Sequence, residues 1–134
     1  MTEPERPWEL DFYTGADGQK PVKSFLSALE KSRPQEFRKI LSKFKLFEKM
    51  GLRAAMEVKL VAPLRGYNGL YELRVKGTGF RFYGFTWEPP DGAPRLLLLA
   101  SAEEKDDTEA DDAVIRRAAE ARTDWYRRHS PGRE

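Results

Sequence analysis

The chain of 134 residues has the length of one domain, and its hydrophobic content of 40% with 12% aromatic residues is enough to fill a core. The absence of cysteine and the single histidine exclude a disulfide framework, a thiol nucleophile and a Cys/His metal site. No apolar run approaches the ~20 residues of a membrane span, and the acidic first residues lack the apolar stretch of a signal peptide. We therefore expect one cytoplasmic domain over residues 1–134, with loose ends at 1–7 and 128–134, that uses no metal, cofactor or membrane.

The net charge of +2 conceals an uneven distribution of charge along the chain. Residues 18–83 hold 15 Lys and Arg against 5 Asp and Glu, whereas residues 103–112 hold 7 acidic residues against Lys105. The basic segment indicates a polyanionic partner, because cations that neutralise phosphates release condensed counterions. The alternative is that the lysines solvate helix faces and bind nothing.

The first half of the chain predicts a strand followed by a helical hairpin. Residues 8–13 alternate as a strand, and a first helix begins at Pro21. A second helix begins at the capping-box pair Ser32 and Gln35 and ends at Gly51. The apolar stripes of the two helices are Val22, Phe25, Leu26 and Leu29, then Phe37, Ile40, Leu41, Phe44 and Phe47.

After Gly51 the apolar period changes from helical to alternating. Strands are predicted at 56–60, 70–76, 80–87 and 95–100, the last of them apolar on both faces as a central strand should be. A second capping-box pattern at Thr108 and Asp111 opens a C-terminal helix. The predicted fold class is α+β in the order β-α-α-β-β-β-β-α, a mostly antiparallel sheet with the N-terminal helical hairpin packed on one face and a C-terminal helix.

Side-chain alternation on the 70–76 and 80–87 strands sorts their residues onto two faces. If the apolar residues of both strands face the helical hairpin, an opposite face carries Glu72, Arg74, Lys76, Arg81 and Tyr83. Guanidinium groups bind phosphate in bidentate fashion, and a tyrosine ring stacks on bases, so this face predicts an exposed patch for single-stranded RNA. The alternative is a solvated face on which Arg74 pairs with an acid. Phe85 and Trp87, further along, are expected to lie under the last helix.

With these motifs in this order, the chain resembles the RelE/HigB toxins of type II toxin–antitoxin pairs, members of the RelE/ParE superfamily, and most closely their phage-derived HigB-like branch. The resemblance rests mainly on the segments GLYELR at 69–74 and GFRFY at 79–83. Residues 12–13, 95–100 and the closing helix fit the same pattern, so the likeness covers about residues 8–126.

The resemblance implies an endonuclease that cuts mRNA on the ribosome without a metal and is held inactive by a helix-turn-helix antitoxin encoded next to it. By position, Arg74 and Arg81 match basic residues that contact the scissile phosphate, and Lys105 falls where the family usually has a basic cluster. Lys59 and Arg65 lie on the basic approach to that site. The residues with expected catalytic roles are Arg74, Arg81, Lys105 and Glu72, and those expected to bind RNA are Lys59, Arg65, Lys76 and Tyr83. Glu72 is either the general base or a residue that orients Arg74.

One segment departs from the family pattern. Residues 101–107 read SAEEKDD, acidic where the family is basic, and an acidic patch opposes the binding of a polyanion. This segment leaves open a catalytically weak or inactive relative that binds RNA or an antitoxin. The shared superfamily and the absence of a core histidine leave open a gyrase-inhibiting ParE-like toxin.

Overall fold

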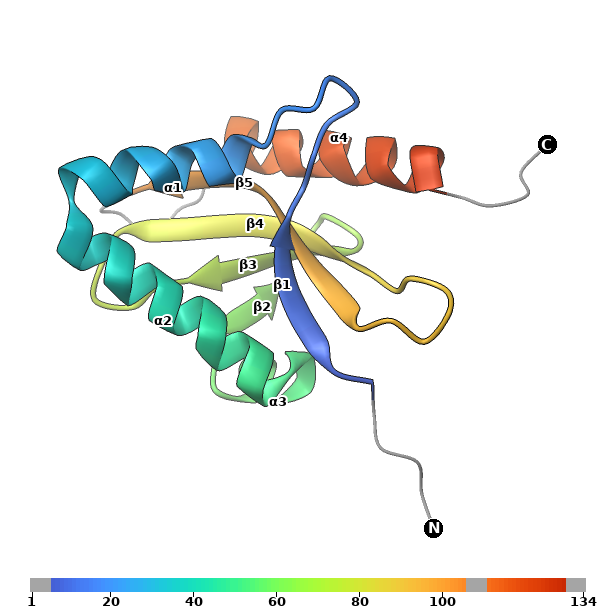
Figure 1. Ribbon diagram of the computed structural model, residues 1–134, viewed down its shortest axis with the longest axis horizontal. Helices are drawn as coiled ribbons and strands as arrows, with labels where there is room; N and C mark the ends of the chain where they lie inside the picture. Colours follow the sequence, from blue (N-terminus) through green and yellow to red (C-terminus); the bar gives the residue numbers. More distant parts are fainter. Residues whose placement is uncertain (1–5, 106–110, 130–134) are drawn as a thin grey trace, which may run out of the picture.

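A five-stranded sheet forms the centre of the computed structural model, which describes residues 6–105 and 111–129 (Figure 1). In spatial order the strands are β1 (Trp8–Phe12), β5 (Arg95–Glu104), β4 (Phe80–Trp87), β3 (Leu70–Arg74) and β2 (Val61–Pro63). β1 runs parallel to β5, and the other neighbouring strands are antiparallel. The predicted α+β class with a mostly antiparallel sheet is confirmed.

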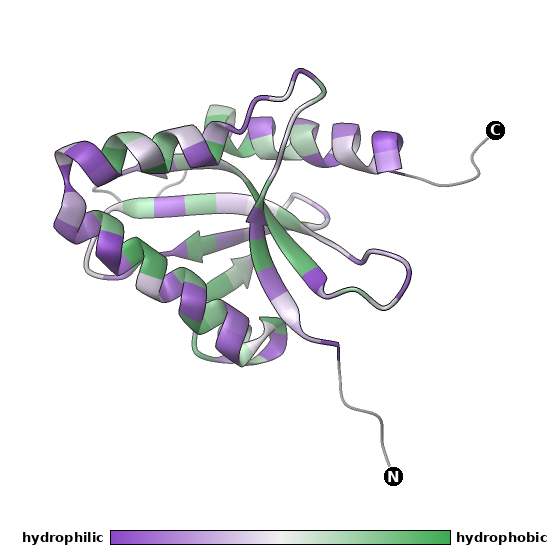
Figure 2. Ribbon diagram, viewed as in Figure 1, coloured by the Kyte–Doolittle hydropathy of each residue, from purple (hydrophilic) through white to green (hydrophobic). Residues whose placement is uncertain are grey.

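Helices cover both faces of this sheet. They are α1 (Pro21–Ser32), α2 (Pro34–Met50), α3 (Leu52–Glu57) and α4 (Asp112–His129). The first three pack on one face, and α4 packs on the other face over β4 and β5 (Figure 1). Hydrophobic and hydrophilic bands alternate along the helices, as expected of helices with one face on the core (Figure 2). Among the described residues, no helix is long and apolar enough to cross a membrane.

Aromatic rings dominate the core under the helical hairpin. The Phe44 ring meets the Phe82 ring edge to face at a centroid distance of 5.1 Å, and Phe25 contacts Phe80 at 6.0 Å. Phe47 is fully buried beneath the same hairpin. Edge-to-face pairs of this kind add about 0.5–1.5 kcal/mol each beyond the burial of their area. The alternation predicted for the 70–76 and 80–87 strands therefore holds on this face.

A second aromatic core lies under α4, where Phe85 contacts Trp125 as expected. Residues 128 and 129 of the predicted loose end belong to α4, and residues 130–134 lie outside the described residues. The His129 ring stacks on Trp125 at 3.8 Å, and Arg128 donates a hydrogen bond of 2.6 Å to the carbonyl oxygen of Thr14. These contacts fix the last helical turn against the aromatic core.

A β-bulge changes the alternation of β5 at Ala100. Tyr83 pairs with Ser101 and Gly84 with Leu99, which leaves Ala100 as the extra residue. Gly84 is required here, because a Cβ at this position would lie 2.1 Å from the Leu98 carbonyl oxygen. Beyond the bulge the strand continues to Glu104, four residues further than the alternation predicted.

The predicted strand at 56–60 is wrong, because these residues complete a helix. Leu60 donates its N–H to Ala55 O and Lys59 donates to Met56 O, the two bonds of a Schellman motif. Lys59 takes the left-handed position of that motif with φ 63°. Met56 and Leu60 therefore pack on the core from α3 and the turn that follows it, whereas Val58 at the C-cap is exposed, and the strand starts at Val61.

The predicted helix caps are correct only in part. Ser32 ends α1 and its hydroxyl donates to Ala28 O, so Arg33, and not Ser32, stands at the N-cap of α2. Asp111 caps α4 by accepting the Ala113 N–H at 2.8 Å. Thr108 lies outside the described residues.

Candidate nucleic-acid interface

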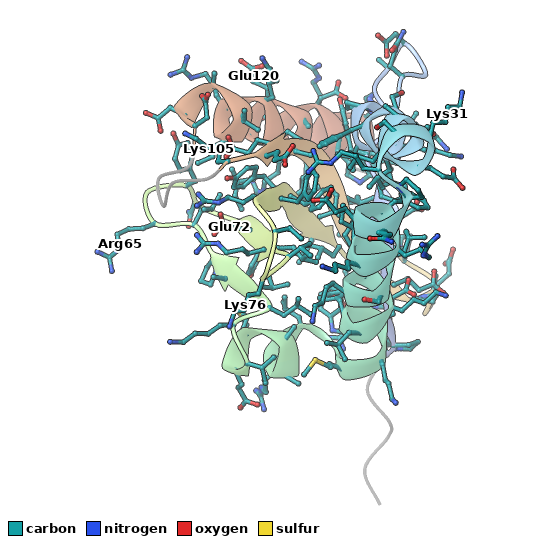
Figure 3. All side chains as sticks on the ribbon, turned by 90° about the vertical axis from the view of Figure 1, so that its left-hand side faces the viewer. Lys31, Arg65, Glu72, Lys76, Lys105 and Glu120 are labelled. Carbon is teal, nitrogen blue, oxygen red and sulfur yellow. The ribbon has the colours of Figure 1, made fainter. Side chains whose placement is uncertain are left out.

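The sheet face around β2 and β3 carries a groove of about 440 Å³ beside α3. α4 packs over β4 and β5 and leaves this part of its face open. The polar lining of the groove is Lys59, Glu72, Arg74 and Lys76, and its apolar lining is Met56 and Leu60–Pro63. Figure 3 shows Glu72 and Lys76 on the same open side of the molecule.

Each polar side chain reaches the groove for a local reason. Glu72 and Arg74 are alternate residues of β3, and Lys76 follows with the same parity after the strand ends. Lys59 arrives from the other side, because the Schellman motif reverses the chain there before β2 begins. Four of the eight predicted site residues thus line one groove, three of them exposed cations and one a half-buried carboxylate.

Glu72 contacts both arginines of this region, Arg74 and Arg81. Its Oε1 accepts from Arg74 Nη2 at 3.4 Å, and its Oε2 lies 3.8 Å from Arg81 Nε. The Tyr83 hydroxyl oxygen lies 3.5 Å from the same Oε2. This geometry is compatible with the second role expected for Glu72, to orient Arg74, and it brings Arg81 close to the same carboxylate.

The prediction that Arg81 and Tyr83 are exposed is wrong. Arg81 is Arg74's direct partner across the β3–β4 pair, but it is 4% exposed, and Tyr83 is completely buried. The cause is the longer β5, which brings Glu103 opposite Arg81 and lets it accept a hydrogen bond from the Tyr83 hydroxyl. Burial, with the Glu103 contact, raises the pKa of Tyr83 far above its usual value. Tyr83 therefore presents no ring face for base stacking.

Lys105 and Arg65 lie outside the lining of the groove. Lys105 donates its backbone N–H to Gly79 O at the end of the β4–β5 pair. Arg65 is exposed in the loop between β2 and β3. Figure 3 shows both on the same side of the molecule as Glu72, so they extend the basic surface on either side of it.

Glu103 is the residue beside this region whose position the alternation missed. The sequence marked its segment as acidic but placed it after the last strand, where it had no assigned partner. As a β5 residue it contacts Tyr83 directly and receives the Asp111 N–H at 3.2 Å. Its neighbour Glu104 points to the opposite face and pairs with Arg33 at 2.6 Å.

Within residues 6–105 and 111–129, no group of three or more His, Cys, Asp or Glu side chains is placed to hold a metal ion. The groove, with three cations and one carboxylate that contacts Arg74, suits an anionic ligand. No family model, curated protein or solved structure matches the chain.

Proposed function

We propose that the chain is a RelE/HigB-type toxin with a RelE-like fold, an endoribonuclease that cuts mRNA on the ribosome. The observation that carries the proposal is the β2–β3 groove, which gathers Lys59, Arg74 and Lys76 around Glu72. Three cations against one carboxylate favour a phosphodiester, and the exposed Arg65 extends the surface along which an RNA strand would run.

The chemistry proposed for the groove is attack of a ribose 2′-hydroxyl on the adjacent phosphorus. The new 2′ O–P bond forms as the bond to the 5′-oxygen breaks, which yields a 2′,3′-cyclic phosphate and a free 5′-hydroxyl. Arg74 neutralises the charge that develops on the phosphate and stays protonated throughout, so it cannot be the base. Lys59 and Lys76 are the ammonium groups placed to protonate the leaving 5′-oxygen. Glu72 holds Arg74 in position, and the 2′-hydroxyl proton passes to water.

A second candidate is a relative that binds RNA or a helix-turn-helix antitoxin without cleaving RNA. The burial of Arg81 favours it, because one of the two arginines expected on the phosphate lies beneath the surface beside Glu72. In this interpretation Arg74 alone grips the phosphate, and Arg81 supports the sheet.

Induced expression in a bacterial host, with transcript mapping, tests both candidates. We expect growth arrest and cleavage inside coding regions, and we expect Arg74→Ala to abolish both effects. Arg38→Ala, which removes an exposed arginine of α2, is the matched control and should remain toxic. Intact transcripts without growth arrest support the second candidate. Loss of DNA supercoiling with intact transcripts indicates a gyrase-inhibiting toxin and refutes the proposal.

A further inference from the structure

Half of β5 lacks a neighbour on one side. β1 pairs with β5 from Trp8 opposite Arg95 to Phe12 opposite Leu99. The Tyr13 N–H makes one more bond, to Leu99 O at 3.0 Å, and the chain then turns away. Among the described strands, residues 101–104 of β5 therefore pair with β4 alone, and Ala100 is the bulge residue.

A groove of about 510 Å³ lies along this unpaired edge. Pro21 and Phe25 of α1 form one wall, and Arg117, Glu120, Ala121 and Asp124 of α4 form the other. Ala100, Ser101 and Ala102 of β5 lie between them, with Tyr13 at the end where β1 stops. α1 and α4 lie next to each other at the top of Figure 3.

The backbone groups of β5 fix which residues face this groove. Ser101 and Glu103 pair with β4, and the Lys105 N–H donates to β4's neighbour Gly79. Because alternate residues of an antiparallel strand bond to opposite sides, Ala102 and Glu104 direct their N–H and C=O groups away from β4. These groups lie at the edge that the groove follows.

The outer edges of the sheet are protected, in contrast to this inner one. On β1, Leu10 donates its N–H to Glu48 of α2, and the Phe12 N–H donates to Asp11, each at 2.8 Å. β2 has three residues and ends in Pro63, which has no N–H. A backbone N–H bonded to a carboxylate, a short strand and a proline each prevent a further strand from pairing. The edge formed by residues 100–104 has none of these three features.

We propose that this groove binds an extended segment of a partner protein, which pairs with Ala102 and Glu104 and continues the line of β1. The edge is recessed between two helices, so a single strand can enter, whereas the edge of a second folded copy would meet α1 and α4 first. Apolar side chains of the segment would rest on Phe25 on one face and on Ala121 on the other. On the rim, Asp124 is already paired with Arg127 and Arg128, so Glu120 is the carboxylate to which a lysine or arginine of the segment would be directed.

The test uses the whole protein and a synthetic peptide of about six residues, a usual strand length, that alternates valine and lysine. We expect the peptide to protect the Ala102 and Glu104 amides from hydrogen exchange and to shift the NMR signals of Phe25. A peptide N-methylated on the amides that face β5 should bind about tenfold more weakly or not at all, because it lacks the donors while the protein is unchanged.

Two protein variants separate the rim charge from a general effect of charge. Glu120→Lys should weaken binding about threefold, while Glu30→Lys, the same change at an exposed site of α1, should leave it unchanged. Equal binding of the N-methylated peptide, or no saturable shift at residues 100–104, refutes the proposal. Self-association of the chain through these residues without peptide refutes it as well. None of these readouts depends on RNA cleavage.

Discussion

The Glu72 cluster gives a prediction about which arginine the carboxylate stabilises more. Glu72 lies 3.4 Å from Arg74 and 3.8 Å from Arg81, so distance alone favours the first pair. Burial favours the Glu72–Arg81 pair, since the Arg81 side chain is 5% exposed and that of Arg74 is 44% exposed. We expect this difference in burial to decide which pair is the more stabilising, because solvent screens the Glu72–Arg74 pair.

The expected magnitudes follow from the local dielectric. Unit charges about 4 Å apart attract by about 1 kcal/mol in water and by about 4 kcal/mol at an effective dielectric of 20. Desolvation offsets part of the second value, which leaves a net coupling of about 1–3 kcal/mol for Glu72 with Arg81. For Glu72 with Arg74 the coupling should be about 0.5 kcal/mol, as for other exposed pairs.

Two double-mutant cycles measure these couplings by urea unfolding. One combines Glu72→Gln with Arg81→Met, and the other combines it with Arg74→Met, so that each arginine is replaced by a side chain of similar length without charge. A Glu72–Arg74 coupling equal to or larger than that of Glu72–Arg81 refutes the reasoning. It would mean that Arg81 draws its stability from contacts other than Glu72.

Three further predictions concern single positions. Lys59→Gly should raise the free energy of unfolding by roughly 0.5–1 kcal/mol, because it relieves a left-handed backbone, and should lower the salt dependence of RNA binding by about one counterion. Stability that falls instead contradicts the Schellman assignment. Gly84→Ala should cost about 3 kcal/mol or more in urea unfolding, since the new methyl meets a β5 carbonyl oxygen at 2.1 Å. Hydrogen bonds from Arg128 and Tyr13 lower the pKa of Asp124 to about 2, below its usual value near 3.8, so its stabilising effect is complete above that usual value and is lost as pH falls through 2. Asp124→Asn should remove this part of the acid dependence of the melting temperature, and an unchanged profile refutes it.

The sequence alone predicts those helices and strands whose apolar residues repeat with a clear period. The stripes of α1 and α2 and the apolar alternation of β3 and β4 toward the helical hairpin agree with the structure, whereas the other face of β4 is buried as well. Residues 56–60 were misassigned, since three apolar residues at every second position also fit a helix end at which Met56 and Leu60 pack on the core and Val58 is exposed. A lysine in the left-handed position gave no glycine signal for that cap.

The groove was only partly predictable for a related reason. Local alternation correctly placed Glu72, Arg74 and Lys76 on one face, because that inference needs no partner strand. The exposure of Arg81 depends instead on where β5 ends, and the acidic residues after Ala100 gave no apolar pattern by which to extend that strand. The burial of Arg81 depends on tertiary structure, and it can be inferred only once Glu103 of β5 is placed opposite Arg81.

The acidic segment, which argued against a nucleic-acid ligand, has its Glu103 and Glu104 on opposite faces of β5. Alternation along β5 sends Glu104 to the hairpin face, where the hydrogen bond from Arg33 lowers its pKa and balances its charge. Glu103 is directed to the other face, where it bonds the buried Tyr83 hydroxyl. Neither carboxylate lines the β2–β3 groove, so the electrostatics of that groove are set by its own three cations and Glu72. In the described part of this segment, the negative charge is therefore used within the protein, and it does not argue against a polyanion at the groove.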